Sequence, residues 1–172
     1  MIQFQNTWNK AKNSIFRLES LPEYRIKHDL ENFEKFKKRN PYIGSKERQW
    51  FSQLKKTKQK GVKIQRTRII SLPLSDYLRY EINFWQHSIK NGEEILFLDK
   101  KDYIRIKSKL KIKSKDFWMF DDKVLVIFYY DSKGRWLNEK IITNNKVINN
   151  YKKLKKELIK HAVPMYDFLK RY

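Results

Sequence analysis

The sequence predicts an α/β fold, a single mixed-sheet sandwich with flanking helices. Segments whose apolar residues recur at helical spacing stand before and after a group of alternating segments rich in β-branched residues. Helices on either side of mixed strands are typical of layered α/β domains. With 172 residues, 40% of them hydrophobic, and no repeat or linker, the chain fits one domain over 1–172. We expect a helical part (1–44) and an α/β body (45–172).

The helical part begins with two short amphipathic segments, 2–13 and 29–38. Between them FRLE (16–19) is extended and ends at a Ser-Leu-Pro turn. NPYIGS (40–45) predicts a turn whose serine caps a third helix over 45–61. That helix turns its aromatic and leucine residues to the core and its lysines to solvent, and a glycine ends it.

The hydrophobic period then changes to two, and the run 123–130 is apolar at both parities. Such a strand belongs in the centre of a sheet, covered on both faces. The last helix extends from Val147 to Ala162 and stops before Pro164, and the tail MYDFLKRY is expected to dock on the body. The predicted strands are 62–70, 94–99, 116–120, 123–130 and 135–143.

The chain is strongly basic, with a formal net charge of +21, and contains no cysteine. A field of this size attracts polyanions such as nucleic acid or an anionic membrane surface. The excess consists largely of 30 lysines beside 12 asparagines, a bias that AT-rich coding also produces, so both origins stay open. The lack of cysteine, of a signal-peptide pattern and of an apolar run of ~20 residues predicts a cytoplasmic protein without a membrane span.

GVKIQRTRIISLPLSDYLRYE (61–81) places charge on the core face of a predicted strand. Arg66 and Arg68 share their parity with Val62 and Ile64. An unpaired charge in a core costs several kcal/mol, so these arginines need carboxylate partners or a place at the open end of the sheet. A structural ion-pair network and an anion pocket are the two interpretations.

Counter-ions for the two arginines are available at Glu19, Asp76 and Glu81. We expect Arg68 and Asp76 to lie within ion-pair or water-bridged reach. A pocket would lie at the C-terminal end of the strand 62–70, where ligand crevices form in α/β sheets, and arginine suits carboxylate or phosphate oxygens. The predicted anion- or ligand-binding residues are Arg66, Arg68, Asp76, Tyr77, Arg79, Asp116 and Trp118.

YIRIKSKLKIKSK (103–115) alternates basic and apolar residues in the manner of a strand. The basic face of such a strand would lie against phosphates, with Tyr103 stacked on a base. The alternative is an edge strand or loop whose lysines discourage edge-to-edge pairing. The predicted nucleic-acid-binding residues are Arg105, Lys107, Lys109, Lys111, Lys113 and Lys115.

DFWMFDD (116–122) is a cluster of carboxylates with two interpretations. Asp121 and Asp122 between two strands are ordinary hairpin chemistry, which we favour, although such a cluster also suits a divalent metal or a general base. Asp116 shares its parity with Trp118, which predicts a buried side chain. Metal-ligand spacing, P-loops, G-x-S-x-G and dinucleotide motifs do not occur, so no metal or cofactor is predicted.

Five segments carry a resemblance that runs nearly end to end: FRLESLPEYR, GVKIQRTRIISLPLSDYLRYE, GEEILFL, DFWMFDDKVLVIFYYDSKGRWL and HAVPMYDF. In this order they resemble an uncharacterised bacterial domain family often encoded beside helix-turn-helix regulators. That resemblance implies a helix-turn-helix regulator as a partner. It does not imply the excess of lysine.

Residues 45–165 are also similar in topology to the phospholipase-D-like domains that serve as effector modules of bacterial transcription regulators. In that superfamily the histidine of an H-x-K motif attacks a phosphodiester. The triplets here are His-Asp-Leu, His-Ser-Ile and His-Ala-Val, beginning at His28, His87 and His161. None of these is H-x-K, so an enzyme of that mechanism is excluded, and a degenerate ligand-sensing relative stays open.

Three hypotheses for function follow. The first is a non-catalytic accessory or ligand-sensing domain in transcriptional control, acting through a protein partner or an anionic ligand. The second is direct nucleic-acid binding by the basic surface. The third is an unrecognised nuclease or toxin-like enzyme built around Asp76, Asp116 and His161.

Overall fold

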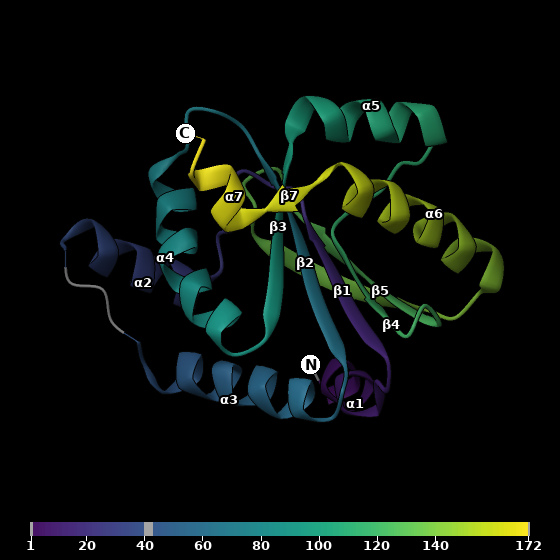
Figure 1. Ribbon diagram of the computed structural model, residues 1–172, viewed down its shortest axis with the longest axis horizontal. Coiled ribbons are helices and arrows are strands. Elements are labelled where there is room, and N and C mark those ends of the chain that lie inside the picture. Colours follow the sequence, from purple (N-terminus) through teal and green to yellow (C-terminus); the bar gives the residue numbers. More distant parts are fainter. Residues whose placement is uncertain (1, 40–42, 172) are drawn as a thin grey trace.

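The computed structural model describes residues 2–39 and 43–171 and shows one mixed sheet between two layers of helices (Figure 1). The strands are β1 (Ser14–Glu19), β2 (Lys63–Ile70), β3 (Glu93–Asp99), β4 (Phe117–Phe120), β5 (Val124–Tyr130), β6 (Trp136–Ile142) and β7 (Val163–Pro164). They form one seven-stranded sheet in the order β6-β5-β4-β1-β2-β3-β7. The strands β1, β2 and β3 are mutually parallel, and the remaining pairs are antiparallel.

The helices divide between the two faces of the sheet (Figure 1). They are α1 (Ile2–Lys10), α2 (Lys27–Lys37), α3 (Ser45–Gln59), α4 (Asp76–Lys90), α5 (Lys100–Leu110), α6 (Asn145–His161) and α7 (Met165–Leu169). One face is covered by α5 and α6, and the other by α1, α3, α4 and α7, with α2 packed outside α4. The predicted α/β sandwich is confirmed.

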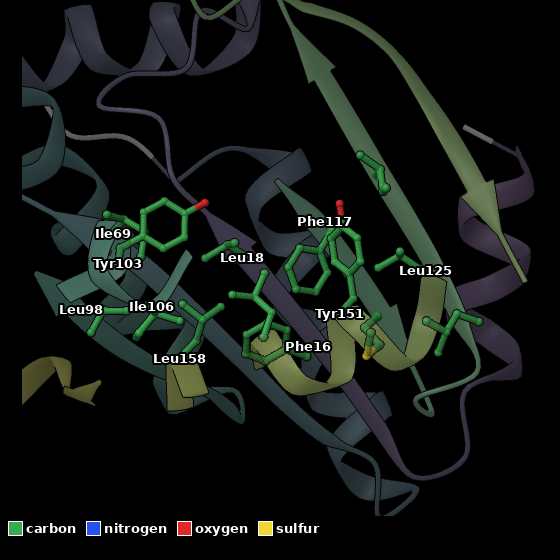
Figure 2. Packing of buried hydrophobic residues seen from close by; sticks show 14 residues of the cluster. Phe16, Leu18, Ile69, Leu98, Tyr103, Ile106, Phe117, Leu125, Tyr151 and Leu158 are labelled. Carbon is green, nitrogen blue, oxygen red and sulfur yellow. The ribbon is translucent and has the colours of Figure 1, made fainter. Parts of the chain in front are cut away.

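The core under α5 and α6 is continuous and apolar (Figure 2). Leu154 and Leu158 of α6 are fully buried, and Tyr151 meets Phe117 of β4 edge to face at 4.9 Å between ring centroids. Each such side chain contributes about 1.5–3 kcal/mol by leaving water. The buried residues of this cluster, among those that the structure describes, are all apolar or aromatic, and the ion pair of Lys155 with Asp122 on this face is partly exposed.

The other face carries two apolar clusters. One joins α1 and α3 to β4 through Trp8, Leu54 and Trp118, and the other joins α4 and α7 to β3 through Trp85 and Phe97. The predicted docking of the tail is confirmed, because Met165 and Phe168 of α7 belong to the second cluster. Charged residues of β1, β2 and β3 share this face of the sheet.

The centre of the sheet differs from the prediction. The middle strand is β1, which the sequence indicated only as an extended segment, and β5 lies second from the β6 edge. The apolar run of β5 is needed because α6 covers Leu125 and Ile127 on one face while Val126 belongs to the cluster of α1 and α3 on the other. Burial on both faces thus indicates an interior strand rather than the central one.

The segment 103–115 is not a strand, and this prediction is wrong. Residues 100–110 form α5, whose first turn is capped by Asp99, which accepts a hydrogen bond from the Lys101 backbone N at 2.7 Å. Tyr103 and Ile106 are buried, three residues apart, whereas Ile104 is 53% exposed. Alternation of lysine with isoleucine imitates a strand, but the buried residues follow the helical period.

The hairpin at Asp121 and Asp122 is confirmed. Both residues have a φ of +53°, which suits aspartate in a tight turn. The carboxylate of Asp121 accepts hydrogen bonds from the backbone N of Lys12, Asn13 and Ser14 at 2.7–2.9 Å. This aspartate therefore fixes the start of β1 beside the hairpin.

Two helix starts differ from the predictions. The cap of α3 is Gly44 rather than Ser45, and part of the predicted turn, 40–42, lies outside the described residues. The helix α4 was not predicted, and it begins where the Ser75 side chain accepts a hydrogen bond from the Leu78 backbone N at 3.2 Å. No helix in the described part of the chain has the length and apolarity to cross a membrane.

Candidate functional site

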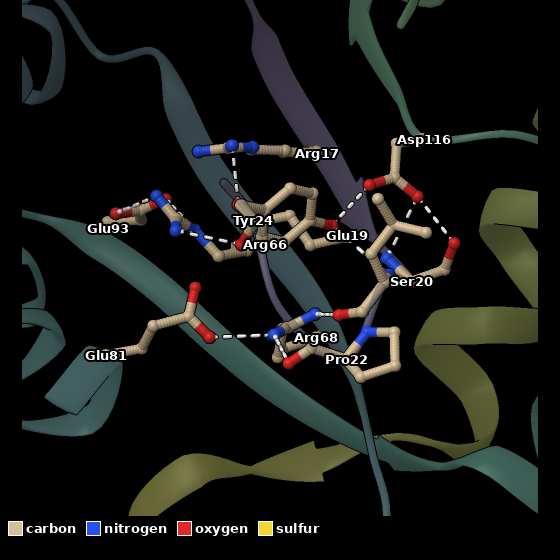
Figure 3. A network of polar contacts seen from close by, with 11 residues as sticks. Arg17, Glu19, Ser20, Pro22, Tyr24, Arg66, Arg68, Glu81, Glu93 and Asp116 are labelled. Carbon is tan, nitrogen blue, oxygen red and sulfur yellow. Dashed lines mark hydrogen bonds and ion pairs between the residues drawn. The ribbon is translucent and has the colours of Figure 1, made fainter. Parts of the chain in front are cut away.

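A layer of ion pairs crosses the middle of the sheet on the face covered by α4 (Figure 3). Arg66 of β2 donates from Nε to Glu93 of β3 at 2.8 Å and from Nη1 to Glu19 of β1 at 2.9 Å. Arg17 of β1 bonds the second oxygen of Glu19 at 2.5 Å. The side chains of Arg66, Glu19 and Glu93 are no more than 4% exposed. These residues share one face on three adjacent strands, so the sheet itself brings them together.

Arg68 forms the second part of this layer. Its Nε and Nη2 donate to one oxygen of Glu81 on α4 at 3.1 and 2.8 Å, and its other donors reach the backbone carbonyls of Leu21 and Pro22. The predicted pairing with Asp76 is wrong, because Asp76 lies exposed on the first turn of α4. Glu81 lies more than one turn further along the helix, where the side chain faces the sheet.

The electrostatics of the layer combine burial with close pairing. Burial alone would raise the pKa of Glu19, but Arg17 and Arg66 outweigh it and hold that pKa below its usual value. Burial raises the pKa of Glu81 to about 7 despite the opposing charge of Arg68. The donors of both buried arginines are occupied by carboxylates and carbonyls, which is the arrangement of the predicted structural network rather than of an anion pocket.

Asp116 is buried, as its parity predicted, at 6% exposure. One carboxylate oxygen accepts from the Ser20 backbone N at 2.9 Å and from the Ser20 hydroxyl, and the other accepts from the Tyr24 hydroxyl. Burial raises the pKa of Asp116 above its usual value. The ring of Tyr24 lies under the Arg68 guanidinium at 5.2 Å. Asp116 thus positions the segment that covers Arg68 (Figure 3).

A pocket of about 250 Å³ lies beside the ion-pair layer, between the sheet and the helices α2, α3 and α4. Aromatic side chains form much of its wall, and charged groups of the layer form its floor. The lining residues are Arg17, Glu19, Tyr24, Ile26, His28, Asp29, Lys46, Glu47, Trp50, Arg66, Tyr77, Tyr80, Glu81, Phe84, Trp85 and Trp118.

The structure brings three of the seven predicted ligand-binding residues to this pocket: Arg66, Tyr77 and Trp118. Arg68 lines a separate cavity of about 130 Å³ at the C-terminal end of β2, the predicted location, while Asp76 and Arg79 are exposed on α4. The pocket is therefore beside the strands rather than beyond their ends.

Several lining residues were missed in the sequence. Arg17 alternates with apolar residues on β1 in the same way as the arginines of β2, and this signal would have found it. Glu19 and Glu81 were predicted as counter-ions of the arginines, and this prediction is confirmed. Asp29, Glu47 and the aromatic residues of α3 and α4 reach the pocket only through helix packing, which the local sequence does not indicate.

The predicted nucleic-acid-binding residues do not share a strand face. Arg105 pairs with Asp102 at 2.9 Å, Lys109 lies 3.7 Å from Glu157 of α6, and the others are distributed along α5 and the segment that follows it. Together α5, the residues up to Lys115 and α6 form a surface that we call the lysine layer (100–115 and 145–161). It lies on the opposite side of the sheet from the pocket (Figure 1).

The residues proposed for a nuclease lie on separate elements: Asp76 on the first turn of α4, Asp116 just before β4, and His161 at the end of α6. The other histidines are engaged with α3, where His28 bonds Glu47 and His87 stacks on Phe51 at 5.6 Å. Within 2–39 and 43–171, no three His, Asp or Glu side chains converge as metal ligands.

Solved structures with a similar fold define the class. The phospholipase D family member Nuc from Salmonella typhimurium superposes with a TM-score of 0.55 at 9% identity, over 95% of this chain and 88% of that chain. The archaeal chromatin protein TrmBL2, whose structure shows a novel mode of DNA binding, superposes with a TM-score of 0.50 at 14% identity, over 94% of this chain. The chain spans 49% of the TrmBL2 chain. The fold is phospholipase-D-like.

Within that fold class, the sequence itself assigns the family. Residues 2–170 match the family model described as a domain of unknown function, DUF6879. The chain belongs to this family. The search of curated proteins found no match.

Proposed function

We propose that the protein is a non-catalytic, ligand-sensing accessory domain in transcriptional control. The observation that carries the proposal is the pocket between the sheet and α2, α3 and α4, because it combines aromatic walls with fixed charged groups. Sites for small molecules are concave, largely apolar and supplied with a few oriented polar groups. The lack of an H-x-K sequence at any of the three histidines supports binding rather than phosphohistidine catalysis.

The ion-pair layer supports a sensing role through rigidity. Glu81 joins α4 to β2, and Glu19 joins β1 to β2, so the floor of the pocket is held by the strands and one helix. The helix α2 packs on α4 through aromatic contacts such as Phe33 with Tyr77 at 5.4 Å, and His28 and Asn32 of α2 hydrogen-bond to Glu47 of α3. A ligand between α2 and the fixed floor would alter the position or stability of α2, and a partner protein would respond to that change.

A thermal-shift screen of small metabolites tests the binding step. Ile26→Trp narrows the rim of the pocket, and Ile104→Trp makes the same change at an exposed position of α5 on the opposite side of the sheet. Ligands of the pocket should stabilise the wild type and Ile104→Trp equally and Ile26→Trp less. Ligands that stabilise Ile26→Trp as much as the wild type would contradict the proposal that they bind in this pocket.

The regulatory step is tested with a helix-turn-helix regulator, the partner that the family resemblance implies. We expect the protein to bind that regulator and to change its affinity for operator DNA, and a ligand from the screen to alter the change. An operator affinity that is the same with and without the protein would contradict a role in transcriptional control.

A second candidate function is direct nucleic-acid binding by the lysine layer. The observation that favours it is the concentration of charge: residues 100–115 and 145–161 hold fourteen Lys and Arg against two Asp and Glu. The fold is similar to that of TrmBL2, which binds DNA, and this similarity adds support. Clustered lysines neutralise phosphates and release counter-ions.

A salt titration of duplex binding tests this candidate. Replacing Lys152, Lys153, Lys156 and Lys160 by Gln should flatten the slope of log affinity against log salt by about 0.9 for each phosphate that is no longer neutralised. The matched control replaces four exposed lysines of the opposite layer, Lys55, Lys56, Lys58 and Lys60, with the same change of net charge. Equal slopes for the two quadruple variants would assign binding to net charge alone.

A further inference from the structure

The pocket is rich in carboxylates, although the chain as a whole carries a charge of +21. The arginines in and behind the pocket are already paired: Arg17 and Arg66 share Glu19, Arg66 also pairs with Glu93, and Arg68 pairs with Glu81. The lysine of the lining, Lys46, is exposed. The acidic groups that line the pocket or lie directly behind it are Glu19, Asp29, Glu47, Glu81, Glu93 and Asp116.

Three of these carboxylates have oxygens that accept no hydrogen bond. Among the described residues, Asp29 makes no hydrogen bond or ion pair, and Arg68 holds one oxygen of Glu81 while the other has no partner. Glu47 is 6% exposed and accepts from Asn32 at 2.8 Å through one oxygen, while its Oε2 is buried without a partner in the described structure. The Oε2 of Glu47 is the buried one of these oxygens, and a buried carboxylate oxygen without a donor is unfavourable. Asp29 is half-buried, and Asp29 and Glu81 both line the pocket, where a ligand that donates would reach them.

Asp29 and Glu81 act on the same part of the pocket. Burial and then the charges of Glu81 and Asp29 raise the pKa of Tyr77, and burial with the same two charges raises the pKa of Tyr80. The two phenol rings are neighbours, with centroids 5.8 Å apart. Negative charge and aromatic faces therefore meet between α2 and α4.

The aromatic walls already hold cations of the protein. The Arg17 guanidinium lies 4.8 Å from the centroid of Trp118, and that of Arg66 lies 5.3 Å from the centroid of Trp85. The negative face of an aromatic ring attracts cations, and the attraction strengthens when the cation is shielded from water. The same negative ring faces would repel an anion.

We propose that the pocket binds a small organic cation, with an ammonium or guanidinium group beside Asp29 and Glu81 and a flat apolar body between the rings of Tyr77, Tyr80 and Trp50. This inference rests on the proposed ligand-sensing function and names the class of ligand. A volume of about 250 Å³ suits a small amine, since sites for drug-sized ligands begin at roughly 300 Å³. It replaces the anion that the arginines alone had indicated.

Three probes of similar size and different charge test the inference: phenethylamine, phenethyl alcohol and phenylacetate. We expect calorimetry at neutral pH to show the amine binding about tenfold more tightly than the alcohol, and phenylacetate most weakly. Asp29→Asn should remove most of the difference between amine and alcohol. Glu31→Gln, an exposed carboxylate on the same helix, is the matched control and should leave the difference unchanged.

A second variant addresses the aromatic wall. Tyr80→Leu keeps an apolar side chain but removes the ring, so it should weaken the amine more than the alcohol. If the alcohol or the carboxylate binds as tightly as the amine, the inference that the ligand is a cation is overturned. The proposal that the pocket binds a ligand would still stand. If none of the probes binds, the cation inference is overturned, whereas the proposed function fails only if the metabolite screen also finds no ligand that depends on the rim residue Ile26.

Discussion

The two helical layers of the molecule differ in the balance and the burial of their charged residues. The layer of α2, α3 and α4 holds ten Lys and Arg against six Asp and Glu, and its acidic groups include buried Glu47 and Glu81. The lysine layer on the other side holds fourteen against two, and most of its charged side chains are exposed. Beneath it the core is apolar, whereas beneath α4 the sheet carries the ion pairs of Arg66 and Arg68.

This difference separates two kinds of electrostatic effect. Buried pairs are fixed in position and costly to disturb, because each partner left alone is an uncompensated charge in a medium of low dielectric. Exposed lysines contribute little individually, but together they produce a field that extends about a Debye length into solvent. One side of the sheet is suited to a defined ligand, and the other is suited to a polyanion.

The largest expected effect comes from a substitution that disrupts the buried ion-pair layer. Arg66→Met removes the partner that Glu19 and Glu93 share, so Glu93 loses its ion pair in the core and Glu19 keeps only Arg17. We expect a loss of about 3–5 kcal/mol in the free energy of unfolding, measured by urea denaturation. The control is Arg105→Met on α5, whose exposed pair with Asp102 should contribute less than about 1 kcal/mol.

A double substitution sharpens this prediction. Replacing Glu93 by Leu together with Arg66→Met removes the carboxylate that lost its ion pair, so part of the lost stability should return. Equal stability of Arg66→Met and the wild type would show that the ion-pair layer is not needed for folding. It would also remove the fixed floor from the proposed pocket.

The next largest effect is a dependence of the free energy of unfolding on pH, which we expect from the buried ion-pair layer and not from the lysine layer. Burial raises the pKa of Glu81 to about 7 from its ordinary value of 4.5, so the folded protein keeps a proton that the unfolded chain has released between these values. Stability from this group is full below the lower value and is lost as pH rises through the higher one. The expected loss is roughly 3 kcal/mol, since one unit of pKa corresponds to about 1.4 kcal/mol.

Denaturation of the wild type and Glu81→Gln across this pH range measures the effect. The wild type should lose stability relative to the variant as pH rises, because the variant lacks the titrating group. The histidines are common to both proteins, and their contributions cancel in the difference. Parallel curves for the two proteins would contradict a raised pKa for Glu81.

The sequence predicted the fold where the period and composition of a segment were unambiguous. The strand 62–70 and the helix ending before Pro164 are such segments. It failed for α5, because alternating lysine and isoleucine satisfies the strand pattern at nearly every position, and only packing of Tyr103 and Ile106 on the sheet selects the helix. A local pattern does not decide between two periods that bury similar amounts of apolar surface.

The candidate site was predicted in part for a related reason. The parity of Arg66 and Arg68 indicated buried charge correctly, since parity is a property of one strand. Their partners lie on other elements, and choosing Glu81 over Asp76 required knowing that 76–90 is a helix and which side of it meets the sheet. The proposed charge of the ligand follows from these partners, which the arginines alone did not reveal.

The smallest expected effect concerns the lysine layer. Raising salt from about 0.05 M to about 0.5 M screens repulsion among exposed lysines and should stabilise the wild type by about 1 kcal/mol. The quadruple Gln variant at Lys152, Lys153, Lys156 and Lys160 should gain clearly less, because part of the repulsion is already gone. Arg66→Met should gain as much as the wild type, since its charges are shielded from solvent. Urea denaturation at both salt concentrations measures all three proteins, and a gain in the quadruple variant equal to that of the wild type would show that the two layers do not differ in this way.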